Sequence, residues 1–143
     1  MDERAIDSTH MDTDECWRLL LRSGAGMLAT GAAGRPDLFP INYLVDGHTL
    51  LFRTAPGTKV VALETVPYAA FGVQGREGDD HWSVVIRGQV EALTDRTEII
   101  GSGVLELVTW GAGAKHVFFR LVPTSVQGRR VLASDLARAT LYG

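Results

Sequence analysis

Residues 81–93 read HWSVVIRGQVEAL and form the clearest strand in the sequence. Large apolar residues alternate there with smaller or polar ones: Trp82, Val84 and Ile86 against Ser83, Val85 and Arg87. Successive side chains of a strand point to opposite faces, so this spacing predicts one face buried in a core and one more exposed face. The sequence on either side of this strand predicts the rest of the fold.

Shorter segments with strand character flank it. They are residues 26–30, 38–45, 49–54, 68–73, 116–122 and 125–132, the last two on either side of Pro123. Asp46-Gly47 is a strong hairpin signal, whereas residues 75–80 are hydrophilic and predict a loop. Six or seven strands separated by frequent turns are typical of a barrel or a sandwich.

Three short helices are expected around the strands. The first covers residues 13–23, with Thr13 as a candidate N-cap and Gly24 after its end. The second begins at Thr58, which can cap it, and the third covers residues 98–108. The expected fold class is therefore mainly β (α+β), centred on a barrel.

The composition is that of an ordinary globular domain. The chain has 143 residues, 45% hydrophobic and 22% charged, which suffices for one domain with its own core. We expect residues 1–12 to form a flexible N-terminal segment and residues 13–143 a single domain. A net charge of −3 without a basic run argues against nucleic acid or membrane as a partner. A single cysteine, Cys16, and the lack of a signal peptide predict a cytoplasmic location.

Residues 52–59, FRTAPGTK, are the first candidate for binding chemistry. A strand ends there, a Pro-Gly turn follows, and a hydroxyl residue opens a helix. Backbone N–H groups at a helix start favour anions, Thr58 and Lys59 add a hydroxyl and a charge, and Arg53 can add two donors. These are the parts of a phosphate cradle. Spacing alone favours the alternative of a capped helix with two solvated cations, and the P-loop pattern is absent.

Three other segments offer groups to a ligand. Residues 40–43, PINY, place a proline in a strand, which is typical of a sheet edge, a bulge or a ligand contact. Trp82 and Ser83 can stack on or hydrogen-bond to an aromatic cofactor, although such tryptophans are more often core residues. Arg129 and Arg130 can bind an anion or a partner, although a charged edge strand is the commoner explanation.

Metal and hydrolase patterns are missing from the sequence. The four histidines have no HxH or HExxH spacing, and no GxSxG elbow is present. Neither a metal site nor a Ser/His/Asp triad is therefore expected.

Taken in order, these segments resemble the pyridoxamine 5′-phosphate oxidase-like family, in its short bacterial flavin-binding branch. The resemblance covers most of the chain and rests on four segments: residues 34–36, 40–43, 52–59 and 82–88. It implies a six-stranded antiparallel split β-barrel with two or three short flanking helices. It also implies a homodimer that holds two flavins in the clefts between its protomers.

The resemblance further implies an FMN site. Its ligands for the phosphate and ribityl chain are Arg53, Thr54, Thr58 and Lys59. Its lining for the isoalloxazine is Pro40, Ile41 and Asn42, and Trp82 and Ser83 complete the pocket from one protomer or the other. Arg129 is a further candidate for the far side of the cleft.

The chain departs from the family pattern in three places. Gln74-Gly75 stands where the family often has an acidic residue, and residues 108–114 are rich in glycine. The additional substrate-phosphate ligands of the longer pyridoxamine phosphate oxidase are not found. We therefore do not expect oxidation of vitamin B6 to be the activity.

The resulting hypothesis is an FMN-dependent oxidoreductase acting on an unknown small organic substrate, in which the flavin performs the electron chemistry and no catalytic side chain is required. The nearest alternative is the same fold with the deazaflavin F420, whose polyanionic tail calls for cations such as Arg129 and Arg130. A third hypothesis is a binding protein without turnover, for a flavin, a nitroaromatic compound or haem, with His81 or His116 as the axial ligand.

Overall fold

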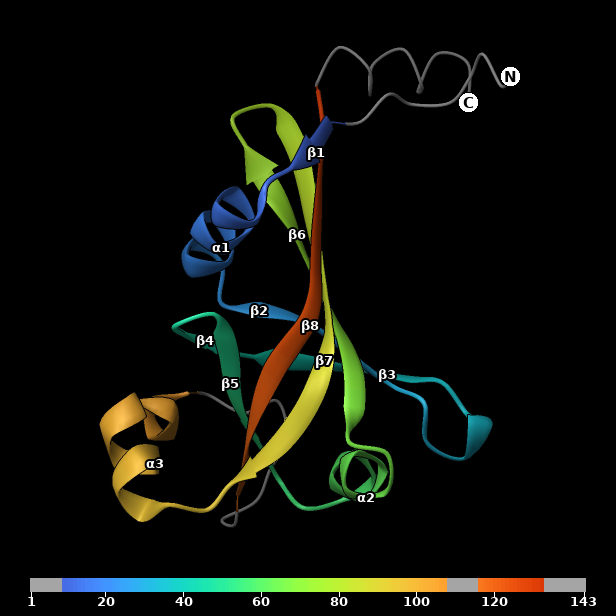
Figure 1. Ribbon diagram of the computed structural model, residues 1–143, viewed down its shortest axis with the longest axis vertical. Helices are drawn as coiled ribbons and strands as arrows, with labels where there is room; N and C mark the ends of the chain where they lie inside the picture. Colours follow the sequence, from blue (N-terminus) through green and yellow to red (C-terminus); the bar gives the residue numbers. More distant parts are fainter. Residues whose placement is uncertain (1–8, 108–115, 133–143) are drawn as a thin grey trace.

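The computed structural model describes residues 9–107 and 116–132 and shows an antiparallel sheet that curls into a half-barrel (Figure 1). Its strands are β1 (Thr9–Met11), β2 (Ala25–Thr30), β3 (Asp37–Asn42), β4 (Leu44–Asp46), β5 (Thr49–Thr54), β6 (Tyr68–Glu77), β7 (Asp80–Leu93) and β8 (Val117–Val131). Its helices are α1 (Thr13–Arg22), α2 (Thr58–Thr65) and α3 (Arg96–Ser102), with 3₁₀ turns η1 (Ala32–Gly34) and η2 (Val104–Glu106). The predicted mainly β fold of split-barrel type is confirmed.

Hydrogen-bonded neighbours follow the order β3-β2-β6-β7-β8-β5-β4, and β1 pairs with β8 beside this path. The long strands β6, β7 and β8 run side by side, and Figure 1 shows β2 and β3 crossing their direction. The sheet therefore bends around a core instead of lying flat. Within the described part of the chain, six strands have six or more residues, and β1 and β4 have three each.

The alternation predicted for residues 81–93 is present in β7. Trp82, Val84 and Ile86 are buried, whereas Arg87 on the other face is exposed. The buried face joins the main core, to which α1 and α2 contribute Leu19, Leu20, Val60 and Leu63. A smaller cluster of Leu51, Leu93 and Val104 lies under α3 and η2 on the opposite face of the sheet. The two faces are thus covered at different places, and part of one face stays open.

Two segments predicted to be interrupted are continuous strands. Residues 75–80 were expected to form a loop, but β6 continues to Glu77 and only a tight turn at Gly78-Asp79 separates it from β7. The two strands predicted around Pro123 are one strand, β8. A register shift at Arg87/Gly88 accommodates the proline. Pro123 has no backbone N–H to donate to the neighbouring strand, and a bulge interrupts the regular hydrogen-bond pattern at that position.

One predicted strand is instead divided, and ordered structure begins earlier than expected. Residues 38–45 form β3 and β4 with a break at Tyr43, whose backbone N–H donates to the Gly24 carbonyl (2.9 Å). Residues 9–11 pair with β8, although they were assigned to a flexible N-terminal segment. The glycine-rich segment of residues 108–114 lies outside the described residues.

The caps of the helices differ from those predicted. Asp12, not Thr13, caps α1, since its carboxylate accepts from the Glu15 N–H (2.8 Å). Gly57 precedes α2 in place of Thr58, with no side-chain bond at that cap. The third helix ends at Ser102, and not at residue 108, because Gly103 adopts a left-handed conformation (φ 85°).

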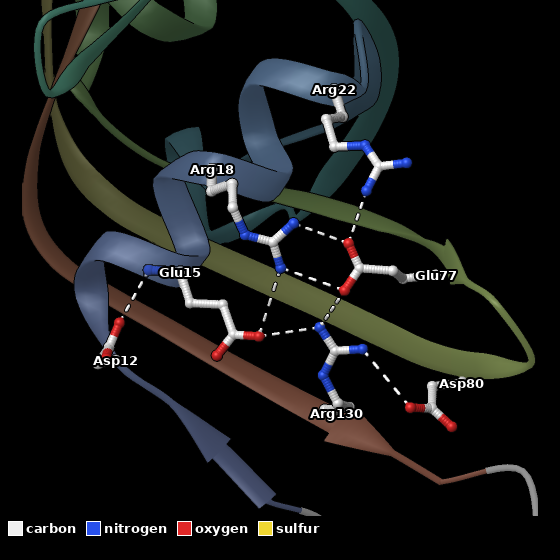
Figure 2. Close-up of polar contacts among 7 residues, drawn as sticks. All are labelled: Asp12, Glu15, Arg18, Arg22, Glu77, Asp80 and Arg130. Atoms are coloured by element: carbon white, nitrogen blue, oxygen red, sulfur yellow. Dashed lines mark hydrogen bonds and ion pairs between the residues drawn. The ribbon is translucent and has the colours of Figure 1, made fainter.

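A network of ion pairs attaches α1 to the β6–β7 hairpin and the end of β8 (Figure 2). Glu77 accepts from Arg18 (2.7 Å), Arg22 (2.6 Å) and Arg130 (2.8 Å). These bonds, first that of Arg18 and then that of Arg130, lower the pKa of Glu77 to about 2. Arg130 also contacts Glu15 (2.9 Å), so its guanidinium is committed to internal partners. None of the helices in the described ranges is long and apolar enough to span a membrane.

Candidate functional site

The first turn of α2 presents backbone donors. Gly57 adopts a φ of 157°, which a residue with a side chain rarely takes, and it caps α2 without a side-chain hydrogen bond. The Val61 N–H donates to the Gly57 carbonyl (3.1 Å), and the N–H groups of Thr58, Lys59 and Val60 have no intrahelical acceptor. Thr58 is exposed as the first helical residue. A helix start of this kind favours an anion.

Lys59 lies at this helix start. It is half-buried, and its ammonium lies 5.2 Å from the centroid of the Phe39 ring on β3. Burial lowers the pKa of Lys59. In residues 9–107 and 116–132, no carboxylate lies within 4.0 Å of its ammonium. The protein thus holds a partly desolvated cation next to backbone donors that have no acceptor within the helix.

The two residues at the end of β5 diverge. Thr54 is buried on the face of the main core, and its hydroxyl donates to the Ala55 carbonyl (3.3 Å). Arg53 points to the other face, where Nη1 donates to the Leu105 carbonyl of η2 (2.7 Å) and Nε is buried without a partner among the described residues. Thr58 and Lys59 therefore lie at the helix start, whereas Thr54 is turned into the core and the Arg53 guanidinium is held against η2.

The segment of residues 40–42 lies on an edge of the sheet, as its proline predicted. β3 is the end strand of the order and pairs only with β2 among the described strands. Pro40 is exposed opposite Met27, Ile41 is buried in the core, and Asn42 is half-buried. Phe39, the neighbour of Pro40, contacts Lys59, so this edge adjoins the start of α2.

Trp82 and Ser83 point to opposite faces of β7. Trp82 is buried on the α1 side, where a Cβ at Gly75 would lie 2.7 Å from its ring. Ser83 is half-buried opposite Gln74 on one side and Arg129 on the other, and cross-strand partners share a face. Ser83 thus stands in a polar row with Gln74 and Arg129, while Trp82 belongs to the core.

The end of β5 and the Trp82–Ser83 part of β7 are far apart in one chain. Arg53 pairs with Phe118, and Phe118 pairs with Leu93 at the end of β7. Trp82 lies near the other end of β7, about 36 Å away at ~3.3 Å per residue. Ser83 is thus distant from the end of β5, and it points to the face of the sheet opposite to Phe39, the ring that Lys59 contacts.

Part of the sheet is not covered by a helix within the described residues, and we call this part the open face. It consists of Leu38, Pro40, Met27, Ala29, Ala70, Gly72 and Val85. Met27 and Leu38 are 41% and 60% exposed, and a Cβ at Gly72 would meet nothing within 4 Å. Sequence reasoning did not single out the open face or Phe39, and it noted Gln74 only as a departure from the family pattern. The alternation of residues 26–30 was the available signal for Met27.

The described residues offer no metal centre. No group of three or more His, Cys, Asp and Glu side chains that could hold a metal ion occurs within them. His81 is exposed opposite Arg76, and His116 has a buried Nδ1 atom without a partner among these residues. The candidate site at α2 is made, within the described residues, of backbone donors, a hydroxyl and a lysine.

The curled antiparallel sheet with its flanking helices defines a split-barrel protein. A family model described as pyridoxamine 5′-phosphate oxidase matches residues 12–130. The chain belongs to the pyridoxamine 5′-phosphate oxidase family, which confirms the resemblance of its motifs.

Individual proteins show the same relationship. An uncharacterized protein of Mycobacterium tuberculosis is 32% identical over 91 residues, which are 60% of this chain and 78% of that protein. A putative pyridoxamine 5′-phosphate oxidase of Corynebacterium glutamicum has a similar structure, with a TM-score of 0.78, 27% identity, and coverage of 88% and 100% of the two chains. An FAD binding protein of Mycobacterium smegmatis gives a TM-score of 0.72 and 34% identity over 86% and 98%.

Proposed function

We propose that this protein is a flavin-dependent oxidoreductase that holds the phosphate of FMN at the start of α2 and acts on a small organic substrate. The observation that carries the proposal is Lys59, a half-buried cation with no carboxylate within 4.0 Å in the described ranges. Burial of a charge is costly unless a partner compensates it. A phosphate would accept from Lys59 and from the free N–H groups of α2 at once.

The edge strand β3 offers a path for the rest of the ligand. Phe39 contacts Lys59, and the next residue, Pro40, is exposed on the open face. A ligand with its phosphate at α2 can pass over this edge and place its ring system along residues 40–42. The ring system then lies against a surface made of small and apolar side chains, which suits a flat aromatic group.

A bound flavin supplies the transfer of electrons, and the protein supplies position and environment. In this proposal Lys59 and the first turn of α2 bind the phosphate, and Thr58 adds a hydroxyl donor. Pro40 and Asn42 orient the ring system at the sheet edge. The apolar side chains of Met27 and Leu38 help to exclude water from the reacting face.

A second copy of the chain completes this site in the proposed arrangement. Ser83 and Gln74 point to the side of the sheet that carries the open face, whereas Lys59 contacts Phe39, which packs against the main core on the other side. In a homodimer formed through the open face, the polar row of one copy can lie over the helix start of the other. This row, and not Trp82, would then face the ligand.

Two observations bear on the choice of cofactor. The similar protein from Mycobacterium smegmatis is named for FAD, which makes FAD the second candidate. Arg130, one of two cations considered for an F420 tail, is engaged by Glu15 and Glu77, which weakens the case for F420. A carrier without turnover remains the alternative from another class. The feature that favours haem is His116, whose buried Nδ1 has no partner within residues 9–107 and 116–132.

The deciding experiment is a titration of the purified protein with FMN, FAD, F420 and riboflavin, after its absorption spectrum has been recorded. Wild type is expected to bind a flavin saturably. The Lys59→Met variant is expected to lose at least about tenfold in affinity for FMN, because a charge-assisted hydrogen bond is removed, and to keep its affinity for riboflavin.

Arg96→Met is the matched control, since it removes an equal charge from an exposed position on α3. Its affinity for FMN should equal that of wild type. A wild type that binds none of the four ligands would overturn the proposed function. An equal loss for FMN and riboflavin in Lys59→Met would show that Lys59 does not act on the phosphate. A Soret band in the first spectrum would favour haem.

A further inference from the structure

We infer that Phe39 is a positioning residue, whose ring holds the Lys59 ammonium beside the start of α2 before a phosphate binds. The inference rests on the proposed flavin site and deepens it. Sequence reasoning gave Phe39 no role.

The geometry of the pair is that of a cation–π contact. The Lys59 nitrogen lies 5.2 Å from the ring centroid, within the ~6 Å over which the ring quadrupole attracts a cation. Phe39 is partly buried and packs against the main core, so its ring does not move freely. Lys59 is thus held by a fixed surface and not by a mobile carboxylate.

No acidic side chain competes with a ligand for Lys59 within the described residues. A carboxylate on Lys59 would neutralise the charge and compete with an incoming phosphate. An aromatic ring stabilises the ammonium and leaves its charge and its N–H donors available to an anion. No carboxylate lies within 4.0 Å of Lys59 in residues 9–107 and 116–132, so the ring is the stabilising partner that the structure records.

The contact also joins the two halves of the candidate site. Phe39 lies on the edge strand β3 and pairs with Leu28, and Lys59 is the second residue of α2. Holding the lysine over this ring fixes one long side chain in the region where the ligand passes from α2 to β3. A side chain that is already ordered loses less freedom on binding, which increases affinity without a new contact.

The test is a double-mutant cycle read by flavin affinity. Phe39→Leu removes the ring and keeps an apolar side chain, and Phe39→Tyr keeps the ring. Phe39→Leu is expected to weaken the affinity for FMN about threefold to tenfold and to change the affinity for riboflavin less than about twofold. Phe39→Tyr is expected to bind FMN nearly as tightly as wild type. In a Lys59→Met background, Phe39→Leu should change the FMN affinity less than about twofold, because the partner of the ring is gone.

Several results would overturn the inference. The first two are an unchanged FMN affinity in Phe39→Leu and a loss of riboflavin affinity as large as the loss of FMN affinity. The other two are a loss of FMN affinity that persists in the Lys59→Met background and a gain in FMN affinity in Phe39→Leu. The last would mean that the lysine must leave the ring to bind. Wild type that binds no flavin would instead overturn the proposed function, and the role of Phe39 with it.

A measurement without ligand checks the contact itself. Protons on the terminal carbon of Lys59 should show an upfield ring-current shift in wild type and in Phe39→Tyr, and this shift should be lost in Phe39→Leu. Equal thermal midpoints for Phe39→Leu and wild type would show that the affinity change is not a folding defect. A wild type without the ring-current shift would contradict the inference directly.

Discussion

Gly88 is a residue where the backbone leaves no room for a side chain. It lies in β7 at the register shift opposite Pro123, and a Cβ there would collide with the Val122 carbonyl oxygen and lie 2.8 Å from Pro123 Cα. Both obstacles are backbone atoms, which cannot rotate away. The bulge that lets β8 pass Pro123 without a break therefore depends on this glycine.

Gly88→Ala is expected to lower the free energy of unfolding by about 1–3 kcal/mol, the usual cost of overpacking. Gly101→Ala is the matched control, because a Cβ on this exposed residue of α3 meets nothing within 4 Å. The control should raise stability by up to about 1 kcal/mol through helix propensity. Urea unfolding of both variants measures the difference, and equal effects would contradict the role given to Gly88.

At the scale of elements, the Glu77 network fastens α1 to the β6–β7 hairpin (Figure 2). The pKa of Glu77 in the folded protein is about 2, below its ordinary value of 4.5, because Arg18 and Arg130 donate to the carboxylate. The unfolded chain therefore takes up the proton first as the pH falls. The stabilisation is complete above pH 4.5 and is lost as the pH falls towards 2.

Glu77→Gln is accordingly expected to be less stable than wild type at pH 7, with a difference that shrinks as the pH falls from 4.5 towards 2. Chemical unfolding at several pH values in this range measures it. Glu64→Gln, at an exposed position of α2, should match wild type throughout. A difference between Glu77→Gln and wild type that is independent of pH would show that packing, not charge, is involved.

Local patterns predicted most of the elements because local interactions determine them. The alternation around Trp82 and the Asp46-Gly47 turn each depend on a few adjacent residues. The continuity of β8 through Pro123 depends on a strand about 35 residues away in sequence, which supplies Gly88 at the bulge. Non-local compensation of this kind cannot be seen in the proline's own neighbourhood.

The candidate site was predictable in its residue types but not in its geometry. The helix start with Thr58 and Lys59 followed from a turn and a hydroxyl residue. The contact between Lys59 and Phe39 joins two elements that only the folded chain brings together. The capture of Arg53 by η2 is likewise tertiary, so strand position alone could not separate Arg53 from Thr54.

At the scale of the whole molecule, the open face is the surface on which we expect a second copy to pack. Sedimentation should give about twice the 15.5 kDa of one chain. Leu38→Asp places a charge on this face and is expected to shift the protein towards monomer. Leu21→Asp, at a 67% exposed position of α1, is the control that should leave the dimer intact. A monomeric wild type at micromolar concentration would contradict the proposed arrangement.

The placement of Ser83 on β7 has a consequence for how such a protein responds to dilution. In the proposed dimer, the Ser83 end of β7 in one copy would serve the binding site of the other copy. Subunit association and cofactor retention then become thermodynamically linked, and each strengthens the other by mass action. Dilution would release the cofactor from both sites together, so the apparent affinity for the flavin would rise with the concentration of the protein itself.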